Sequence, residues 1–249
     1  MRYVFDVDGT LCFNGILIDQ LIIDALKELE QNGHELFFAS ARPIRDLLPV
    51  IGEFKESKLI GGNGSIIAEN GTITVTRAID HESYAAILSL IKRYGLSYII
   101  DDAWNYAAEI ASGHPVLKQL DPDHLAEKIA LEKIAAPIKI ILLDLPAELY
   151  ATIYQELQKN PQLFLITHNQ AGNIDITAKN INKFTTLTNF FPAAEYIAFG
   201  NDHNDIDLLR HAQVSYFVGE QTFCEPFDLT PDYFLPQDSA QIAAAIKNF

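Results

Sequence analysis

The chain has 249 residues, of which 49% are hydrophobic and 20% charged, a composition typical of a globular protein with a large core. Its formal charge of -15 at pH 7 argues against a nucleic acid or an anionic membrane surface as partner, because both require a positive patch. No apolar run reaches the roughly 20 residues needed to cross a bilayer, and the two cysteines fit a reducing compartment. We therefore expect a cytoplasmic protein.

The first expected element is a buried strand at residues 3–5, followed directly by two acids and a glycine. Ligands bind at the carboxyl ends of strands in α/β proteins, and residues two apart point to the same side. Asp6 and Asp8 are therefore expected to face one ligand together. Mg²⁺ would offset their repulsion, and one acid could attack phosphorus while the other carries protons. An ordinary Asp-Gly turn is the alternative interpretation.

A helix and a second strand are expected next. Residues 16–32 have apolar side chains at helical spacing, residues 35–40 form an apolar run, and this order predicts a parallel βαβ unit. Ser40, Ala41 and Arg42 follow that strand and could hold phosphate oxygens through a hydroxyl and backbone N–H groups. Ser40 is equally typical of a helix N-cap, and Arg42 could bind substrate or pair with a carboxylate.

A third strand is expected at residues 58–60, leading into a glycine-rich stretch that contains Asn63 and Gly64. Asn-Gly is an ordinary turn dipeptide, so this stretch requires no function. Residues 65–67 and 73–75 are expected to pair as a hairpin.

From about residue 77 the pattern changes to a self-contained set of elements. Helices are expected at residues 84–94, 123–133 and 148–159, and strands at 97–100, 138–143 and 163–167. We predict three segments: a core from 1–76, an inserted smaller unit from 77–172, and the rest of the core from 173–249. Residues 101–106 mix acids and aromatics, which is typical of a sugar-binding surface or of a solvated loop with packed aromatics.

The extended segment 173–177 is expected to return the chain to the core. Lys179 and Lys183 follow it, and an ammonium near a phosphorylated acid would offset charge on the transferred group. An apolar strand at 196–200 then ends in a dense cluster of Asn and Asp residues. Together with the two N-terminal acids this cluster favours a site for a hard cation over a simple polar turn. The last elements expected are a helix at 206–212, strands at 214–218 and 233–235, and a helix at 239–247.

These motifs, taken in order, resemble those of the haloacid dehalogenase (HAD) phosphohydrolases. Asp-Val-Asp-Gly-Thr-Leu at residues 6–11 resembles the first motif, Ser-Ala-Arg at 40–42 the second, and Gly-Asn-Asp-His-Asn-Asp at 200–205 the fourth. In the Cof-type branch, whose pattern covers essentially the whole chain, the motif lysine falls on Lys183, with Lys179 as a second choice. The resemblance implies an α/β fold: a doubly wound parallel-sheet, Rossmann-like core with an inserted smaller α/β cap.

The resemblance also implies roles for individual residues. Asp6 would be the nucleophile and Asp8 the general acid and base, with Lys183 as the third catalytic residue. The substrate and phosphate contacts implied are Ser40, Ala41, Arg42, Asn63, Gly64 and Asn204. The Mg²⁺ ligands implied are Asp6, Asp8 through its backbone carbonyl, Asn201 and Asp205, the last either directly or by orienting another ligand.

Two positions depart from the family pattern. Asn201 stands where the family has its metal-binding Asp, which removes one negative charge and should weaken cation binding unless Asp202 compensates. Phe184 follows the motif lysine, where glycine is common.

We predict a Mg²⁺-dependent phosphatase that acts on a small phosphorylated metabolite, a sugar phosphate being the common target of the family, through an aspartyl phosphate. A phosphomutase with the same nucleophile is one alternative, and a non-catalytic sensor of a phosphorylated ligand is another, which Asn201 favours. The sequence leaves the particular substrate and the oligomeric state open.

Overall fold

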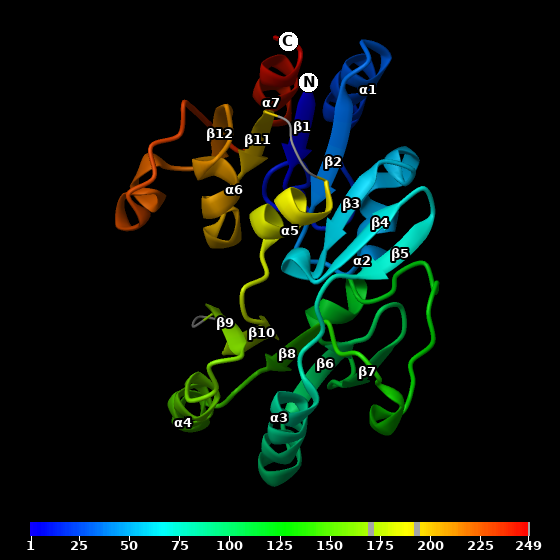
Figure 1. Cartoon of the computed structure of the whole chain (residues 1–249), viewed down its shortest axis with the longest axis vertical. Helices are drawn as coiled ribbons and strands as arrows, with labels where there is room; N and C mark the ends of the chain where they lie inside the picture. The colour runs from blue at the N-terminus through cyan, green and yellow to red at the C-terminus, as the bar shows by residue number, and fades with distance from the viewer. Residues whose placement is uncertain (169–171, 192–194, 249) are drawn as a thin grey trace.

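The computed structural model of the chain describes residues 1–168, 172–191 and 195–248. Within these residues the strands form an eight-stranded sheet and a five-stranded sheet, which lie in the upper and lower halves of Figure 1. The strands of the larger sheet are β1 (Arg2–Phe5), β2 (Glu35–Ala39), β3 (Lys58–Gly61), β4 (Ile66–Glu69), β5 (Thr72–Val75), β11 (Tyr196–Gly200), β12 (Val214–Val218) and β13 (Tyr233–Leu235).

The larger sheet has the strand order β13-β12-β11-β1-β2-β3-β4-β5, in which β4 and β5 form an antiparallel hairpin at one edge. Strand β4 is also antiparallel to β3, whereas the remaining neighbours, from β13 to β3, are parallel. Strand β1 lies between β2 and β11 with Phe5 opposite Phe38 and Phe199. The carboxyl ends of these three strands consequently meet at one edge of the sheet, where the polar motifs follow them.

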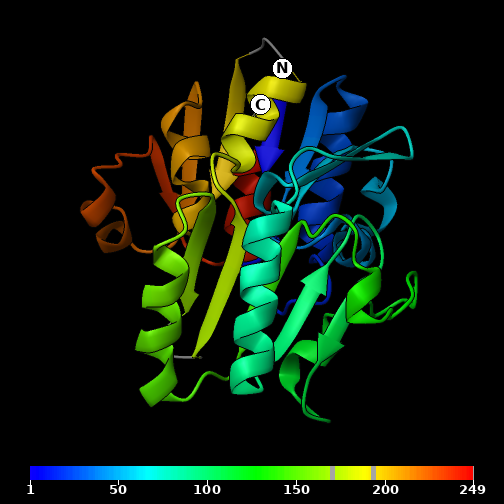
Figure 2. The same cartoon turned by 60° about the horizontal axis from the view of Figure 1, so that its bottom comes forward.

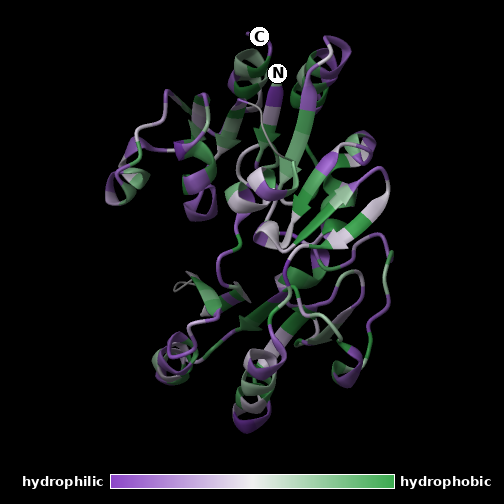
Figure 3. Ribbon diagram, in the orientation of Figure 1, coloured by the Kyte–Doolittle hydropathy of each residue, from purple (hydrophilic) through white to green (hydrophobic). Residues whose placement is uncertain are grey.

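Helices cover both faces of this sheet. They are α1 (Gln20–Gln31), α2 (Ile44–Ile51), α5 (Lys183–Phe190), α6 (Ile206–Arg210) and α7 (Ser239–Ile246). Tyr3 and Phe5 pack in one apolar cluster with α1, α2 and α7, whereas Val4 packs in another with α5 and α6. The strands between them are strongly hydrophobic (Figure 3). This arrangement confirms the predicted doubly wound α/β core.

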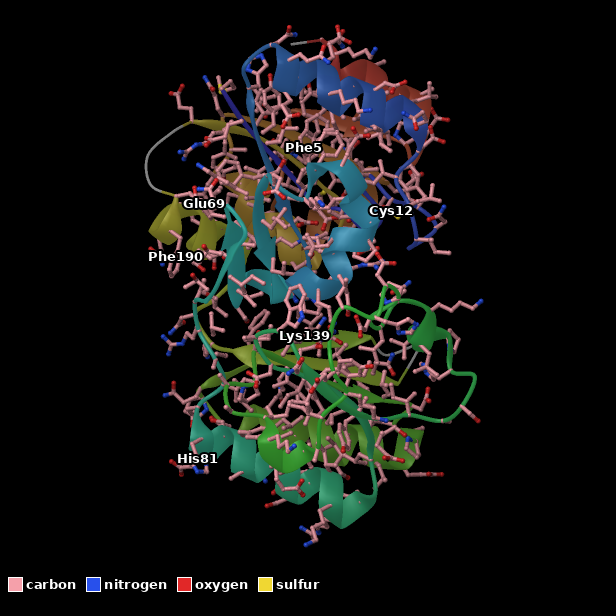
Figure 4. All side chains as sticks on the ribbon, turned by 90° about the vertical axis from the view of Figure 1, so that its right-hand side faces the viewer. Phe5, Cys12, Glu69, His81, Lys139 and Phe190 are labelled. Atoms are coloured by element: carbon pink, nitrogen blue, oxygen red, sulfur yellow. The ribbon has the colours of Figure 1, made fainter. Side chains whose placement is uncertain are left out.

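The smaller sheet is antiparallel and has the order β7-β6-β8-β10-β9. Its strands are β6 (Ser97–Asp101), β7 (Tyr106–Glu109), β8 (Lys139–Leu143), β9 (Leu163–His168) and β10 (Asn173–Ala178). Helices α3 (His81–Tyr94) and α4 (Ala147–Gln158) cover one face, as Figure 2 shows. This sheet with its two helices is the smaller α/β cap expected beside the core. Lys139 of β8 lies at the junction of the two units (Figure 4).

The helix predicted at residues 123–133 is wrong: apart from one short turn at Leu131–Lys133 this stretch is irregular. The Asp121 carboxylate accepts hydrogen bonds from the backbone N–H groups of Leu125 and Ala126, at 2.7 and 3.3 Å. The chain then pairs with Tyr106, whose carbonyl accepts from the N–H of Ile129 at 2.8 Å. Contacts with the edge of the sheet therefore replace the intrahelical hydrogen bonds that the apolar spacing predicts.

Residues 173–177, expected to begin the return to the core, lie in β10 of the smaller sheet. Ile174 and Ile176 pack toward α3 and α4, while Asp175 pairs with Lys139 at 2.7 Å. The chain rejoins the core at α5, a helix that the sequence pattern did not predict. The exact division of the chain into three segments stays a prediction. Among the described residues, no helix combines the length and apolar character that a membrane crossing requires.

Candidate active site

Three buried charged side chains from distant parts of the chain meet at the carboxyl end of β1. Lys183 Nζ lies 2.6 Å from Asp6 Oδ1 and 2.7 Å from Asp205 Oδ1. Asp6 is 4% exposed, and the other two are fully buried. Lys179 is exposed, so Lys183 is the lysine of the two that reaches Asp6.

Lys183 is the first residue of α5, and the start of this helix is fixed by its own cap. The Asn182 side chain accepts a hydrogen bond from the N–H of Thr185 at 2.8 Å, and the Thr185 hydroxyl accepts from the N–H of Asn182 at 2.9 Å. Gly64 supports the same turn: it has φ +105°, and its carbonyl accepts from the Thr186 hydroxyl at 2.7 Å. A side chain at Gly64 would collide with the Asn182 carbonyl. Gly64 thus allows the first turn of α5, which carries Lys183, to pack closely against it. Its expected contact with substrate stays a prediction.

The buried cluster shifts the proton affinities of its members. Burial raises the pKa of Asp6 to about 7, the neighbouring Asp205 carboxylate adds to this increase, and Lys183 opposes it. Burial alone would lower the pKa of Lys183, but the two carboxylates outweigh that effect and raise it above its ordinary value. The lysine is therefore held as a cation between two acids.

The second oxygen of Asp6 faces a separate group of polar atoms. Asp6 Oδ2 accepts from the Thr10 hydroxyl at 2.8 Å. One end of the Asn201 side-chain amide lies 2.9 Å from Asp6 Oδ2, 3.0 Å from the Asp8 carbonyl oxygen and 3.1 Å from Thr10 Oγ1. Gly9 makes this approach possible, because a side chain there would overlap the Asn201 amide.

This group of atoms fits a magnesium ion. Mg²⁺ binds oxygens at about 2.0–2.1 Å in octahedral geometry, so adjacent ligands lie about 2.9 Å apart. The inner end of the Asn201 amide lies at that spacing from a carboxylate oxygen of Asp6 and from the carbonyl oxygen of Asp8, at 2.9 and 3.0 Å. Within residues 1–168, 172–191 and 195–248 no group of three or more His, Cys, Asp or Glu side chains could hold a metal ion. The donor set that fits Mg²⁺ accordingly contains a single carboxylate side chain.

Asn201 is the residue of the fourth motif that lies beside Asp6. The two acids of the motif, Asp202 and Asp205, make other contacts. Asp205 Oδ2 accepts from the backbone N–H groups of Asn201 and Asp202, at 3.1 and 3.2 Å, while its Oδ1 binds Lys183. The exposed Asp202 side chain accepts from the N–H of His203 at 2.7 Å. Asp205 therefore orients the loop and the lysine, and a direct role for it as a metal ligand stays a prediction.

Asp8 forms a bidentate ion pair with Arg42. Arg42 Nε and Nη2 lie 2.7 and 2.6 Å from the two oxygens of the Asp8 carboxylate, and Nη2 also donates to the Gly15 carbonyl at 2.8 Å. Of the two interpretations of Arg42, this geometry favours pairing with a carboxylate. Ser40 is buried next to it, and its hydroxyl oxygen accepts from the N–H of Arg42 at 3.0 Å.

Asn63 and Asn204 meet across the same edge of the sheet. Asn204 Nδ2 donates to Asn63 Oδ1 at 2.8 Å, and the N–H of Asn63, at φ +57°, donates to the Ser40 carbonyl at 3.1 Å. Asn63 Nδ2 and Asn204 Oδ1 are both buried and have no hydrogen-bond partner among the residues that the structure describes. A buried donor and a buried acceptor left open in this way are suited to a polar ligand, because leaving them unpaired costs about 1–3 kcal/mol each.

A cavity of about 330 Å³ separates the core from the cap beside Asp8. Arg42, Gln119, Lys139 and Ile141 are among the residues that line it. Lys139 reaches across from the cap, and its ammonium donates to the Ala41 carbonyl at 3.1 Å. The cavity has room for roughly ten water molecules, and therefore for an organic group of sugar size.

The main residue that the sequence interpretation missed is Arg45. It is 1% exposed, donates twice to Asp46 at 2.7 and 2.8 Å, and donates to Asp101 at 2.8 Å and to the Trp104 carbonyl at 2.9 Å. Residues 101–106 thus contact α2 of the core, which neither a sugar-binding surface nor a solvated loop predicts. Adjacent opposite charges at 45 and 46 on an otherwise apolar helix were the available signal.

Comparison with known proteins gives the family. The sequence profile described as haloacid dehalogenase-like hydrolase matches residues 3–222. A Haemophilus influenzae protein, whose name describes it as a candidate phosphatase, is 23% identical over 224 residues, which cover 84% of this chain and 81% of that protein.

Solved structures share the fold at low identity. The HAD subclass IIB sugar phosphatase BT4131 aligns with a TM-score of 0.78 at 22% identity, covering 100% of this chain and 98% of that one. A haloacid dehalogenase-like hydrolase from B. subtilis gives 0.79 at 17% identity, covering 100% and 99%. TM0651 from Thermotoga maritima gives 0.80 at 17% identity, covering 100% and 97%.

The sequence profile spans most of the chain, and the shared fold, with its motifs gathered at one edge of the central sheet, agrees with it. The prediction of a HAD-type enzyme is thereby confirmed: the chain belongs to the family of haloacid dehalogenase-like hydrolases.

Proposed function

We propose that the protein is a Mg²⁺-dependent phosphatase that hydrolyses a small phosphorylated metabolite through an aspartyl phosphate on Asp6. One observation carries this proposal: Asp6 has one carboxylate oxygen held by the buried Lys183 and the other directed to the oxygens that fit a cation. A nucleophile held in this way keeps a fixed orientation, and cations placed about it would offset the charge of a phosphoryl group.

In the first step, Asp6 attacks phosphorus in line, and Asp8 gives a proton to the departing oxygen of the metabolite. In the second step, Asp8 takes a proton from water, which attacks the aspartyl phosphate and releases inorganic phosphate. Asp8 must part from Arg42 to carry a proton, and the anionic substrate is a group that can draw the guanidinium away.

The remaining polar residues bind and orient. Lys183, the Ser40 hydroxyl and the open Nδ2 of Asn63 would donate to phosphoryl oxygens, whereas the open Oδ1 of Asn204 would accept from a hydroxyl of the substrate. Asp6, the Asp8 carbonyl and Asn201 would hold Mg²⁺. When bound, Mg²⁺ supplies positive charge that offsets the charge of the transferred group.

The cavity beside Asp8 is the space for the rest of the metabolite. Its lining combines Gln119 and charged groups with the apolar Ile99 and Ile141, a mixture suited to a sugar, which has both hydroxyl and C–H faces. The name of BT4131 as a sugar phosphatase is in keeping with this class. A nucleic-acid or membrane partner is not part of the proposal, and the cytoplasmic location stays a prediction.

A screen for inorganic phosphate release from phosphorylated metabolites, sugar phosphates included, tests the function. We expect release by the wild-type protein with Mg²⁺, none by Asp6→Asn, and wild-type rates for Asp202→Asn, which removes an exposed acid of the neighbouring loop. Mass spectrometry of the quenched protein should find one phosphoryl group on the peptide that contains Asp6.

Three outcomes would contradict the proposal. Equal release by Asp6→Asn would assign the activity to a contaminant. Isomerised sugar phosphate without free phosphate would indicate a phosphomutase. Binding of phosphorylated ligands with no turnover, in both the wild type and Asn201→Asp, would indicate a sensor.

A further inference from the structure

The side chain of Asn201 occupies the position from which a metal ligand would reach Asp6, yet it is an amide with two chemically different ends. The end near Asp6 lies within 3.1 Å of Asp6 Oδ2, the Asp8 carbonyl and Thr10 Oγ1, all of which are oxygens. The oxygen and nitrogen of an amide have nearly the same size, so both orientations fit this space.

With its nitrogen inward, Asn201 completes the group of atoms without a cation. Its two N–H hydrogens can donate to Asp6 Oδ2 and to the Asp8 carbonyl, while the Thr10 hydroxyl donates to Asp6. A carboxylate at this position could not do this, because it has no hydrogen to donate at neutral pH.

With its oxygen inward, Asn201 lies 2.9 and 3.0 Å from two oxygens that carry no hydrogen, those of Asp6 and the Asp8 carbonyl. Thr10 has one hydroxyl hydrogen, which can be directed to Asp6 Oδ2 or to Asn201 Oδ1 but not to both. Acceptors crowded in this way repel one another unless a cation lies between them. The oxygen-inward orientation is therefore the one that suits a bound metal.

The charge of the buried cluster also favours the binding of cation and phosphate together. When both carboxylates are ionised, the buried cluster of Asp6, Asp205 and the Lys183 ammonium has one negative charge in excess. A dication alone would reverse that excess, and a phosphoryl dianion alone would triple it. The two together restore the original balance, so each should favour the binding of the other.

We propose that Asn201 makes metal binding by this protein conditional on a bound phosphate: the amide nitrogen closes the site when it is empty, and the amide oxygen turns inward when cation and phosphate bind together. Reciprocity then requires Mg²⁺ to raise the affinity for phosphate by the same factor as phosphate raises the affinity for Mg²⁺. The proposal rests on the proposed function only in placing phosphate and Mg²⁺ at this site.

Isothermal titration calorimetry with MgCl₂ tests this without any turnover. We expect weak Mg²⁺ binding by the wild-type protein alone and an increase of at least about tenfold in the presence of saturating inorganic phosphate. Asn201→Asp should bind Mg²⁺ without phosphate and gain less from its addition. Asp202→Asn should behave as the wild type, and Mg²⁺ titrated into phosphate without protein gives the blank.

Equal Mg²⁺ affinity with and without phosphate in the wild-type protein would overturn the proposal, and this measurement needs no variant that has to fold. Equal behaviour of the wild type and a folded Asn201→Asp would overturn it as well. A failed phosphate-release screen with coupled binding intact would reject the phosphatase function and leave this inference standing.

Discussion

At the scale of single residues, Lys183 determines the character of the site because it is fully buried between two carboxylates. Replacement by methionine would leave Asp6 and Asp205 buried without their cation. We expect Lys183→Met to lower the free energy of unfolding by about 3–5 kcal/mol, the usual cost of breaking a buried ion pair. Urea denaturation measures this value, with the exposed Lys179→Met as a control that should stay within about 0.5 kcal/mol of the wild type.

The raised pKa of Asp6 predicts a pH dependence of stability in the absence of divalent cations. Its folded pKa is about 7, against an ordinary value of 3.8, so the folded protein holds a proton that the unfolded chain has already lost between these values. The contribution of Asp6 to stability is therefore fully present below about pH 4 and is lost as the pH rises through about 7.

Thermal unfolding compared between the wild type and Asp6→Asn isolates this contribution. The amide cannot titrate, so the melting temperature of the wild type should fall relative to that of the variant between about pH 4 and pH 8. Parallel curves for the two proteins would contradict the raised pKa.

At the scale of elements, the junction between α2 and the cap depends on Arg45. Its guanidinium bonds Asp46 in its own helix and Asp101 and the Trp104 carbonyl in the cap, and it lies over the Tyr106 ring with its central carbon 4.8 Å from the ring centre. One side chain thus joins the core and the cap, and its loss would leave two buried acids without the guanidinium that they bind.

We expect Arg45→Met to destabilise the protein by about 3–5 kcal/mol, because Asp46 and Asp101 would remain buried without a cation. The exposed pair Lys247 with Glu28 gives the matched control, and Lys247→Met should cost no more than about 1 kcal/mol. Urea unfolding followed by fluorescence measures both variants. Equal, small effects would show that the junction does not depend on this ion pair.

Some elements of the fold could be predicted from the sequence alone, and others could not. Strands such as β1 and β11 were predictable because short apolar runs bounded by polar turns have few alternatives. The motif that follows β1 gave Asp6 and Asp8, and the family resemblance gave Lys183, whose ammonium lies 2.6 Å from the Asp6 carboxylate. The stretch 123–133 failed because its apolar spacing is helical, whereas side-chain and edge-strand hydrogen bonds from distant residues hold it in another form. Arg45 was missed for the same reason, since its partners Asp101 and Trp104 belong to the other unit.

At the scale of the whole molecule, the formal charge of -15 should oppose the compact state through self-repulsion. Salt screens such repulsion between exposed charges while affecting buried pairs much less. We therefore expect the melting temperature to rise when NaCl is increased from about 0.02 to about 0.5 M at neutral pH. A fall would mean that attractive surface ion pairs dominate over the net charge.

The position of β1 has a consequence for how the protein is made. This first strand lies between β2, which follows it closely, and β11, which is nearly two hundred residues away in the sequence. A nascent chain leaving the ribosome would expose one edge of β1 until residues 196–200 emerge, and exposed strand edges promote aggregation. Pulse-labelled chains stalled before that point should therefore be captured by chaperones, whereas chains stalled after residue 249 with a linker should not.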